Sequence, residues 1–430
     1  MKTLMGSVAI LFLLAQFISI RRSTVESLPS VKRILVWPAE GQGILTPQFS
    51  ADGKFIVLNT RGYEPDGDDA EGLPDSFFKD LEAKEKANPR FADPVVKVIN
   101  LNGEIVCEAQ YGWSPSLSPD DKRIVFSEQV KPITGFRTAA STMSGNAIQM
   151  YDCETKQLTR IAEPQAGYLD TPFFTPDGQS IIFTENEAVN GAFGGPVGIS
   201  RYDLEQNRLQ TLVSERDVPA VPCPLAGPKP GACLDVDVKN LTKSFPQIVH
   251  QVSTAGNEVV ALLGMPVPAP GDIYLARDYD VSLISVLPEP KTILSFGKRN
   301  FEDDEQNGED YSAFQAGSDG SVLIFLKYWK RYSLATGNAM ADLGPRNSKL
   351  KSAYSPNLKY YLCAEPEGEP DHFVLYRTSD GKLVDSLPKM AWVYEATWSA
   401  DSREFATIGV PMAGVSPMHH IEQITVYSIQ

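Results

Sequence analysis

The chain has 430 residues and a formal net charge of −15, and 22% of its residues are charged. This acidic balance argues against nucleic acid as a partner, because binding to a phosphate backbone depends on clustered Lys and Arg side chains. The length and composition fit one large domain that follows an N-terminal segment.

Residues 1–22 have the pattern of a targeting segment. Lys2 precedes an apolar run at residues 4–20, and Arg21 and Arg22 follow that run. The run is long for the core of a signal peptide and short for a helix that spans a bilayer. The sequence therefore predicts export, with the segment either removed as a signal peptide or retained as an N-terminal membrane anchor.

One short pattern recurs seven times: a strand, a tight turn and an apolar strand. At residues 172–185 it reads P-F-F-T-P-D-G-Q-S-I-I-F-T-E. Proline presets one torsion angle of the turn, Asp bonds its own backbone, and Gly accepts the positive φ that closes the turn. In the degenerate fourth copy we place the turn at residues 253–256. The other six copies lie at residues 47–60, 115–128, 251–263, 314–327, 353–365 and 397–409.

A second hairpin of alternating polar and apolar residues follows the first, for example at residues 148–161, 199–212 and 373–387. Two hairpins make a four-stranded antiparallel sheet, and such sheets in tandem are typical of a β-propeller. The motif S-P-D-G-x-x-I-x-F followed by Y-D-x-x-T/Q-x-x-L resembles the WD40-like (PD40) repeat of the TolB-like propellers. The resemblance covers nearly the whole chain after the N-terminal segment. It implies an all-β, seven-bladed β-propeller of four-stranded antiparallel blades, and it says little about function because the repeat occurs in scaffolds, receptors and enzymes.

A lone strand at residues 33–37 follows a polar linker at residues 23–31, and the chain ends on another lone strand at residues 424–428. A propeller has to pair the edges of its sheets, and one blade built from both termini achieves this. We therefore predict that the two terminal strands pair in the last blade. The propeller then spans residues 32–430.

Long insertions are expected at one face of the disc only. In a four-stranded meander the second turn and the link to the next blade lie at one end of the sheet, and the first and third turns lie at the other. Every long insertion falls in a second turn or an inter-blade link. The sequence thus predicts one loop-rich face, and loops on a rigid scaffold commonly carry function. The insertions are residues 61–94, 130–146, 186–196, 215–246, 287–310 and 410–420.

Candidate partner-binding residues lie in these insertions. Phe77, Phe78 and Leu81 share one face of a short amphipathic helix predicted within residues 74–87. The acidic candidates, expected to favour a basic partner or a cation, are Asp66, Asp68, Asp69, Glu302, Asp303 and Asp304. A calcium loop is disfavoured, since Ala70 and Glu71 stand where a ligand and the glycine are required.

The cysteines suggest one disulfide. Cys223 and Cys233 lie ten residues apart in a Pro- and Gly-rich excursion of an exported chain, which favours a bridge between them. Asn240 begins a glycosylation sequon, which has meaning only in a eukaryotic secretory pathway. The remaining cysteines, expected to be core thiols in or beside strands, are Cys107, Cys153 and Cys363.

No catalytic motif is found: G-x-S-x-G, H-E-x-x-H and paired C-x-x-C are all missing. The repeat is similar to that of prolyl-oligopeptidase-type hydrolases, but the chain shows no counterpart of their α/β domain. The alternative is a metal-dependent, polysaccharide lyase-like propeller enzyme, which a similarity to oligogalacturonate lyase implies through histidines in the channel. The histidines are His250, His372, His419 and His420. Their spacing shows no convergent ligand set.

The sequence thus predicts an exported, monomeric and non-catalytic β-propeller that binds a protein or another ligand through its loop-rich face. It is expected in the periplasm, outside the cell or anchored on the non-cytoplasmic side of a membrane. No catalytic, cofactor-binding or metal-ligating residue is predicted, and no cofactor.

Overall fold

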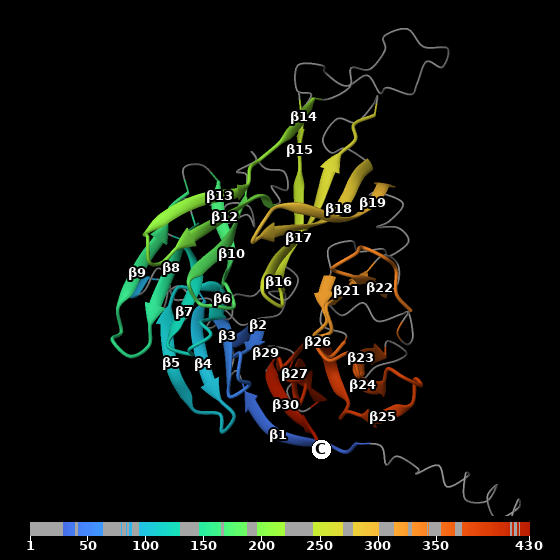
Figure 1. Cartoon of the computed structure of the whole chain (residues 1–430). Coiled ribbons are helices and arrows are strands. Elements are labelled where there is room, and N and C mark those ends of the chain that lie inside the picture. Colours follow the sequence, from blue (N-terminus) through green and yellow to red (C-terminus); the bar gives the residue numbers. More distant parts are fainter. Residues whose placement is uncertain are drawn as a thin grey trace, which may run out of the picture.

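The computed structural model is a seven-bladed β-propeller in which antiparallel sheets stand side by side around one axis (Figure 1). The predicted fold class is confirmed. The structure describes residues 29–38, 42–62, 94–129, 146–164, 167–186, 196–219, 244–269, 278–300, 314–325, 329–341, 343, 354–365, 372–412, 415–416, 419–420 and 422–430, together with residues 79, 83, 86 and 87.

The first three blades each contain four strands in sequence order, counted from the axis outwards. Blade 1 consists of β2 (Gln42–Phe49), β3 (Phe55–Gly62), β4 (Val95–Asn100) and β5 (Ile105–Gln110). Blade 2 consists of β6 (Trp113–Leu117), β7 (Arg123–Gln129), β8 (Asn146–Asp152) and β9 (Leu158–Ala162). Blade 3 consists of β10 (Tyr168–Phe174), β11 (Ser180–Asn186), β12 (Pro196–Asp203) and β13 (Arg208–Val213).

Blades 4 to 6 follow the same order. Blade 4 consists of β16 (Ile248–Ala255), β17 (Glu258–Pro266), β18 (Asp278–Leu287) and β19 (Lys291–Asn300). Blade 5 has β20 (Phe314–Ala316), β21 (Ser321–Phe325) and β22 (Trp329–Ser333). Blade 6 has β23 (Tyr360–Glu365), β24 (His372–Arg377) and β25 (Leu383–Ser386). In the described residues the remaining strand of blades 5 and 6 is reduced to one bridge each, Tyr332 with Ala339 and Tyr354 with Tyr361.

Blade 7 closes the ring. It consists of β26 (Met390–Trp398), β27 (Glu404–Pro411), β30 (Gln423–Ile429) and, outermost, β1 (Val31–Pro38). β1 and β30 run antiparallel from Val31 opposite Ile429 to Trp37 opposite Ile424. Ser30 and Gln430 extend the pairing through two backbone hydrogen bonds of 3.1 and 2.9 Å. The prediction that the terminal strands pair in the last blade is confirmed.

Two short hairpins belong to the ends of the blades that carry the predicted insertions. β14 (Asp217–Pro219) pairs with β15 (Ser244–Pro246) between blades 3 and 4, where Figure 1 shows them projecting from the ring. β28 (Val415–Ser416) pairs with β29 (His419–His420) in the second turn of blade 7.

The hydrophobic core consists of seven clusters, and each lies between two neighbouring blades. β11 shows how the sequence produces this arrangement. Ile181 packs toward blade 2 and Ile182 toward blade 4, because successive side chains of a strand point to opposite faces. The apolar runs in the second strand of each repeat are therefore buried on both sides, as packing between sheets requires.

The repeated first turn is held by a hydroxyl and a carboxylate. In blade 3, Thr175 Oγ1 donates to Asp177 Oδ1 at 2.6 Å and accepts from Ser180 N at 3.0 Å. Gly178 has a φ of +67°, which a residue with a Cβ rarely adopts. The same hydroxyl-based turn recurs at Ser50, Ser118, Ser355 and Ser399.

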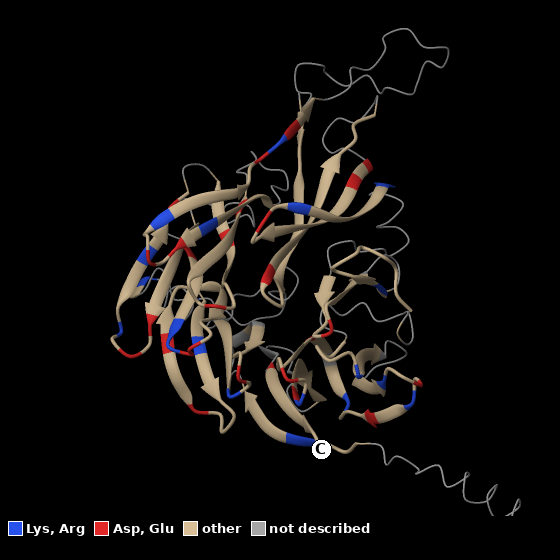
Figure 2. Ribbon diagram, in the orientation of Figure 1, with Lys and Arg blue, Asp and Glu red and all other residues tan. Residues whose placement is uncertain are grey.

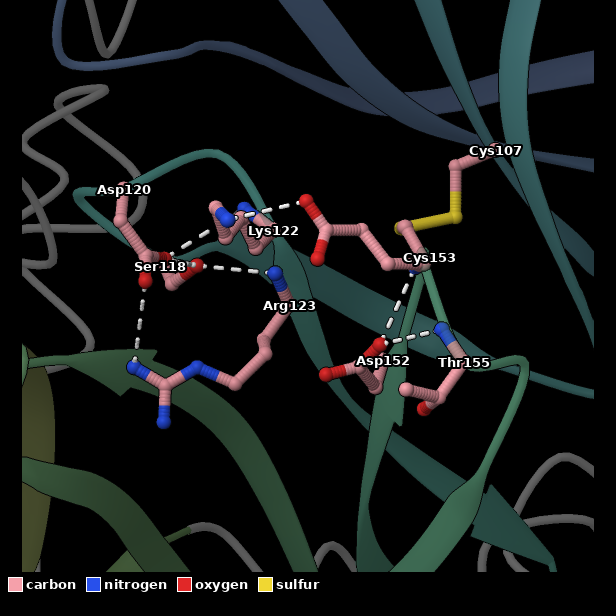
Figure 3. Close-up of a disulfide and its surroundings, with 9 residues drawn as sticks. Cys107, Ser118, Asp120, Lys122, Arg123, Asp152, Cys153 and Thr155 are labelled. Atoms are coloured by element: carbon pink, nitrogen blue, oxygen red, sulfur yellow. Dashed lines mark hydrogen bonds and ion pairs between the residues drawn. A yellow bond between two sulfur atoms is a disulfide. The ribbon is translucent and has the colours of Figure 1, made fainter.

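The expectation that Cys107 and Cys153 are core thiols is wrong. They form a disulfide with a Cα–Cα distance of 5.6 Å, and Figure 3 shows the bridge. Cys107 lies on β5, the outermost strand of blade 1, and Cys153 follows β8 of blade 2. The two meet only because the blades pack face to face. Cys363 is a half-buried thiol that takes no part in this bridge, and its Sγ donates to the backbone oxygen of Ala364 at 3.7 Å. Cys223 and Cys233 lie outside the described residues.

Candidate functional site

The innermost strand of each four-stranded blade contains a β-bulge. In every case the strand nearest the axis holds one residue more than its partner. The register shifts between Leu45 and Gln48 in β2, between Trp113 and Ser116 in β6, and between Asp170 and Phe173 in β10. Corresponding shifts are Val249 to Gln251 in β16 and Val393 to Glu395 in β26.

The bulges of the first three blades coincide with a Ser-Pro or Thr-Pro dipeptide. Proline has no N–H and interrupts the ladder, so in a strand it is tolerated at a bulge. Ser114 and Thr171 have φ values of +47° and +46°, a backbone region that residues with a Cβ seldom occupy. These bulges were not predicted from the sequence. The sequence does mark their positions, because each dipeptide begins four residues before the Ser or Thr of the repeated turn. The dipeptides are Thr46-Pro47, Ser114-Pro115 and Thr171-Pro172.

These bulges lie at or near the middle of the innermost strands; that of β16 is nearer the loop-rich end and that of β2 is nearer the first turn. Each innermost strand enters from an inter-blade link, which lies at the loop-rich end, and runs toward the first turn. Thr171 and Tyr394 occupy bulges and are exposed, and 49% of the Tyr394 side chain is accessible. Bulges redirect side chains and are common beside binding sites. The exposed bulge residues are therefore candidates for contact with a ligand.

A polar cluster joins blades 2 and 3 at this level. Ser127 Oγ donates to Asp170 Oδ1 at 2.9 Å. Thr171 Oγ1 and Thr184 Oγ1 lie 2.9 Å apart, and Thr184 Oγ1 donates to the backbone oxygen of Asp170 at 3.1 Å. Burial raises the pKa of Tyr168, and the carboxylate of Asp170 raises it further. The cluster offers the half-buried carboxylate of Asp170 beside the exposed Thr171, whereas Ser127 and Thr184 are buried.

A second carboxylate lies at the junction of blades 7 and 1. Glu422 Oε2 accepts a hydrogen bond of 2.5 Å from the backbone N–H of Ile44 in β2. Partial burial raises the pKa of Tyr394, and the charge of Glu422 adds to the rise. Tyr394 and Glu422 therefore combine an exposed aromatic ring with a negative charge.

Blades 4 to 6 use their inner polar side chains for internal links. Gln251 donates to Phe314 O at 3.1 Å and accepts from Phe314 N at 2.7 Å. Gln315 makes the equivalent pair of bonds with the backbone of Tyr354. Each amide bonds both the N–H and the C=O of one residue in the next blade and so links two blades that share no backbone ladder. Their role is therefore structural.

All nine predicted partner-binding residues lie outside the described parts of the chain, so their prediction stays open. They are Phe77, Phe78, Leu81, Asp66, Asp68, Asp69, Glu302, Asp303 and Asp304. Within the predicted helix, residues Lys79, Ala83, Lys86 and Ala87 are helical and exposed.

The histidines do not converge on a metal site in the parts of the chain that are described. His250 packs against β17, where a Cβ on Gly264 would lie 2.7 Å from His250 Nε2. His372 begins β24, and His419 and His420 form β29. No group of three or more His, Cys, Asp or Glu residues among the described residues is placed to hold a metal ion. The lyase-like alternative gains no support from these residues.

Charged residues of both signs are interspersed along the outer strands and turns (Figure 2). Among the described residues, no helix has the length and apolar character needed to cross a bilayer.

Comparison with known proteins identifies no family. No protein-family model matches the chain, and no curated protein matches its sequence. The β-propeller domain of the Trilobed protease from Pyrococcus furiosus is 11% identical, with a TM-score of 0.46 over 89% of this chain and 95% of that one. TolB from Acinetobacter baumannii is 14% identical, with a TM-score of 0.31 over 80% of this chain and 53% of that one. The acylaminoacyl peptidase from Pyrococcus horikoshii is 12% identical, with a TM-score of 0.47 over 86% of this chain and 50% of that one. This chain spans about half the length of the last two, and similarity at this level carries no argument about function.

Proposed function

We propose that the protein is an exported, non-catalytic binding module that holds a partner at the loop-rich end of the propeller axis. The observation that supports this function most strongly is the exposure of Thr171 and Tyr394 at bulges of the innermost strands. Register shifts also occur between the two outermost strands of blades 1 to 4, 6 and 7, so a bulge alone does not indicate a binding site. At the axis, however, the bulges leave a hydroxyl and an aromatic ring accessible to a partner.

The partner is proposed to present a basic segment. Asp170 and Glu422 place carboxylates at this level, and the exposed ring of Tyr394 offers a face for a cation. The net charge of −15 favours association with a basic partner, and salt weakens such binding by screening. The acidic insertion residues Asp66–Asp69 and Glu302–Asp304 would add to this attraction.

Two further observations support export and the repeat family. The disulfide between Cys107 and Cys153 suits an oxidising compartment. The S-P-D-G repeats suit a TolB-like or WD40-like propeller, a likeness that concerns the fold more than the function.

A partner trapped from envelope or extracellular fractions by cross-linking tests the proposal. Its affinity is then measured for the parent and for two axis variants, Asp170→Asn and Tyr394→Ser. Each variant is expected to bind about tenfold more weakly, which corresponds to about 1.4 kcal/mol, and raising the salt concentration is expected to weaken binding by the parent.

The matched control is Asp401→Asn on the opposite face. It removes the same charge, and Asn357 already occupies the corresponding turn position in blade 6. Equal loss of binding in the control and the axis variants, or no loss in either axis variant, would show that the binding face has been misplaced.

A further inference from the structure

A cleft of about 750 Å³ lies on the face opposite the loop-rich one, where blade 6 meets the closing strands. Its walls belong to blade 6 and to the paired ends of β1 and β30, which lie next to each other in Figure 1. Blade 6 contributes the turns beside β23 and β24, and the chain ends contribute Ser30 and Gln430. Clefts of 300–1,000 Å³ are typical of small-molecule sites. The lining residues are Pro29, Ser30, Leu343, Leu358, Lys359, Tyr360, Arg377, Thr378, Ser379 and Gln430.

Among the described residues Lys359 has no carboxylate partner, unlike its counterparts in blades 1 and 7. In blade 1, Lys54 lies two residues after the turn aspartate Asp52 and forms an ion pair with it. In blade 7, Arg403 lies 3.6 Å from Asp401 in the same relation. Blade 6 has Asn357 at the aspartate position, and its amide oxygen accepts from Ser355 Oγ at 2.8 Å and from the backbone N–H of Lys359 at 3.0 Å, so it offers no negative charge to the ammonium. The exposed ammonium of Lys359 is thus left beside the cleft without an ion pair among the described residues.

Arg377 supplies a second cation, which is partly neutralised. Its guanidinium donates to Asp380 from Nε at 2.9 Å and from Nη2 at 2.6 Å. The hydrogen bond from Arg377 lowers the pKa of Asp380 to about 2, so this carboxylate is ionised at neutral pH. Lys382 Nζ also lies 3.7 Å from the Asp380 carboxylate. With Lys359 and Arg377, three cations therefore face one side-chain carboxylate at this edge of the cleft, and the local charge is positive. A ligand with a single negative charge complements it.

Thr378 adds an unused hydrogen-bonding group. Its side chain lines the cleft and only 6% of the residue is exposed. Among the described residues its Oγ1 has no hydrogen-bond partner. A buried hydroxyl without a partner destabilises the fold, and rotation about χ1 would turn this one toward a bound group.

The rest of the wall is apolar. Leu343, Leu358 and Pro29 lie beside the polar groups, and Tyr360 contributes a half-buried ring. We infer that this cleft binds a small organic monoanion, with its acidic group at Lys359 and Thr378 and an apolar body along the leucines. Because Ser30 and Gln430 also line the cleft, the ligand bridges blade 6 and the strands that close the ring.

Binding is therefore coupled to ring closure. A ligand that binds the closed ring and not the unfolded chain raises the Tm as its concentration rises. The fatty acid octanoate serves as the probe, and its binding is measured by calorimetry together with the Tm. Octylamine and octanol test the contribution of charge, and inorganic phosphate tests the contribution of the apolar body. Octanoate is expected to bind saturably and raise the Tm, with binding of the other three at least tenfold weaker.

Four variants locate the site. Asn357→Asp restores the aspartate of the repeat and is expected to weaken octanoate binding about tenfold by pairing with Lys359, as is Lys359→Gln. Thr378→Val is expected to weaken binding without lowering the Tm, since it removes the unpartnered hydroxyl. Asp380→Asn is expected to strengthen binding, because it releases Arg377.

Lys54→Gln is the matched control, since Lys54 holds the same repeat position in blade 1. It is expected to bind octanoate as the parent does. The inference is overturned if Asn357→Asp and Lys359→Gln both bind octanoate with parental affinity, or if octylamine binds as well as octanoate. Neither result depends on the partner proposed for the loop-rich face.

Discussion

The hydroxyl of Thr175 has two roles in the first turn of blade 3. It donates to Asp177 and accepts from the backbone N–H of Ser180. The bond from Thr175 holds the pKa of Asp177 below its usual range and outweighs desolvation, which raises it. A folded-state pKa below the unfolded value stabilises the protein above the unfolded pKa, and the contribution is lost as the pH falls through the folded pKa.

We expect Thr175→Val to lower the free energy of unfolding by about 1–3 kcal/mol at pH 7, because the Ser180 N–H loses its acceptor in a buried turn. The difference from the parent is expected to shrink as the pH falls from about 5 toward 2, since the Asp177 contribution is then lost in both proteins. Urea unfolding across this pH range measures both effects.

Thr175→Ser is the control, because Ser50 performs the same role in blade 1. It is expected to retain parental stability. A Thr175→Val difference that grows on acidification would contradict this account of Asp177.

The sequence revealed residue roles where they depend on local chemistry. The Ser/Thr-Pro-Asp-Gly turn was predictable because its hydrogen bonds join residues at most five positions apart. The Cys107–Cys153 bridge was not, because 46 residues separate the two and only the packing of blade 1 on blade 2 brings them together. The bulges at Ser114 and Thr171 were predictable from the Ser-Pro and Thr-Pro dipeptides that begin there, but they were not predicted. The acidic and aromatic candidates in the insertions stay untested predictions.

At the scale of elements, the disulfide links the outermost strand of blade 1 to blade 2. We expect Cys107→Ala and Cys153→Ala, singly or together, to lower stability by about 2–4 kcal/mol, because the bridge restricts a long loop in the unfolded chain. A non-reduced digest analysed by mass spectrometry should show the two peptides joined and Cys363 free to alkylate.

Equal stability of the double variant and the oxidised parent would contradict a stabilising role for the bridge. The same digest tests the predicted bridge between Cys223 and Cys233. Free thiols at both positions in exported protein would show that prediction to be wrong.

The ribbon β14–β15 supports an excursion of the chain between blades 3 and 4. Pro219 lies opposite Ser244, so two residues can replace residues 220–243 and close an antiparallel hairpin. We expect a variant with Asn-Gly in place of residues 220–243 to keep the parental Tm. Phe245→Ala, by contrast, is expected to cost about 3–5 kcal/mol, since Phe245 is buried in the cluster between blades 4 and 5. A large drop in Tm for the shortened variant would give the excursion a structural role.

Element boundaries were predicted best where turn chemistry was explicit. In the degenerate fourth repeat we placed the turn at residues 253–256, but β16 continues to Ala255 and β17 begins at Glu258. The turn is therefore the Gly256-Asn257 pair. The strand continues because residues 251–255 pair with β17 as far as Ala255 opposite Glu258, whereas the small polar residues had suggested a turn.

The overall fold was predictable because the sequence repeats one hairpin. Seven copies of one hairpin specified the ring, and two orphan strands specified its closure. The candidate site was predictable only to the level of a face, because the order of turns in a meander fixes which loops share an end. It does not fix which side chains lie near the axis: Asp170 belongs to blade 3, whereas Tyr394 and Glu422 belong to blade 7.

The last prediction concerns the closure of the ring by β1. β1 supplies the outer strand of blade 7, and Leu35 packs with Ile44 and Ile424 in the cluster between blades 7 and 1. Removing residues 1–40 exposes the edge of β30 and deletes Leu35, whose burial alone is worth roughly 2–5 kcal/mol. Each blade contacts two others, so the loss is not confined to blade 7. We expect one cooperative transition at a clearly lower Tm by calorimetry. Removing only residues 1–28 keeps β1 and should leave the Tm unchanged. If both truncations melt with the parent, the terminal strands do not hold the ring together.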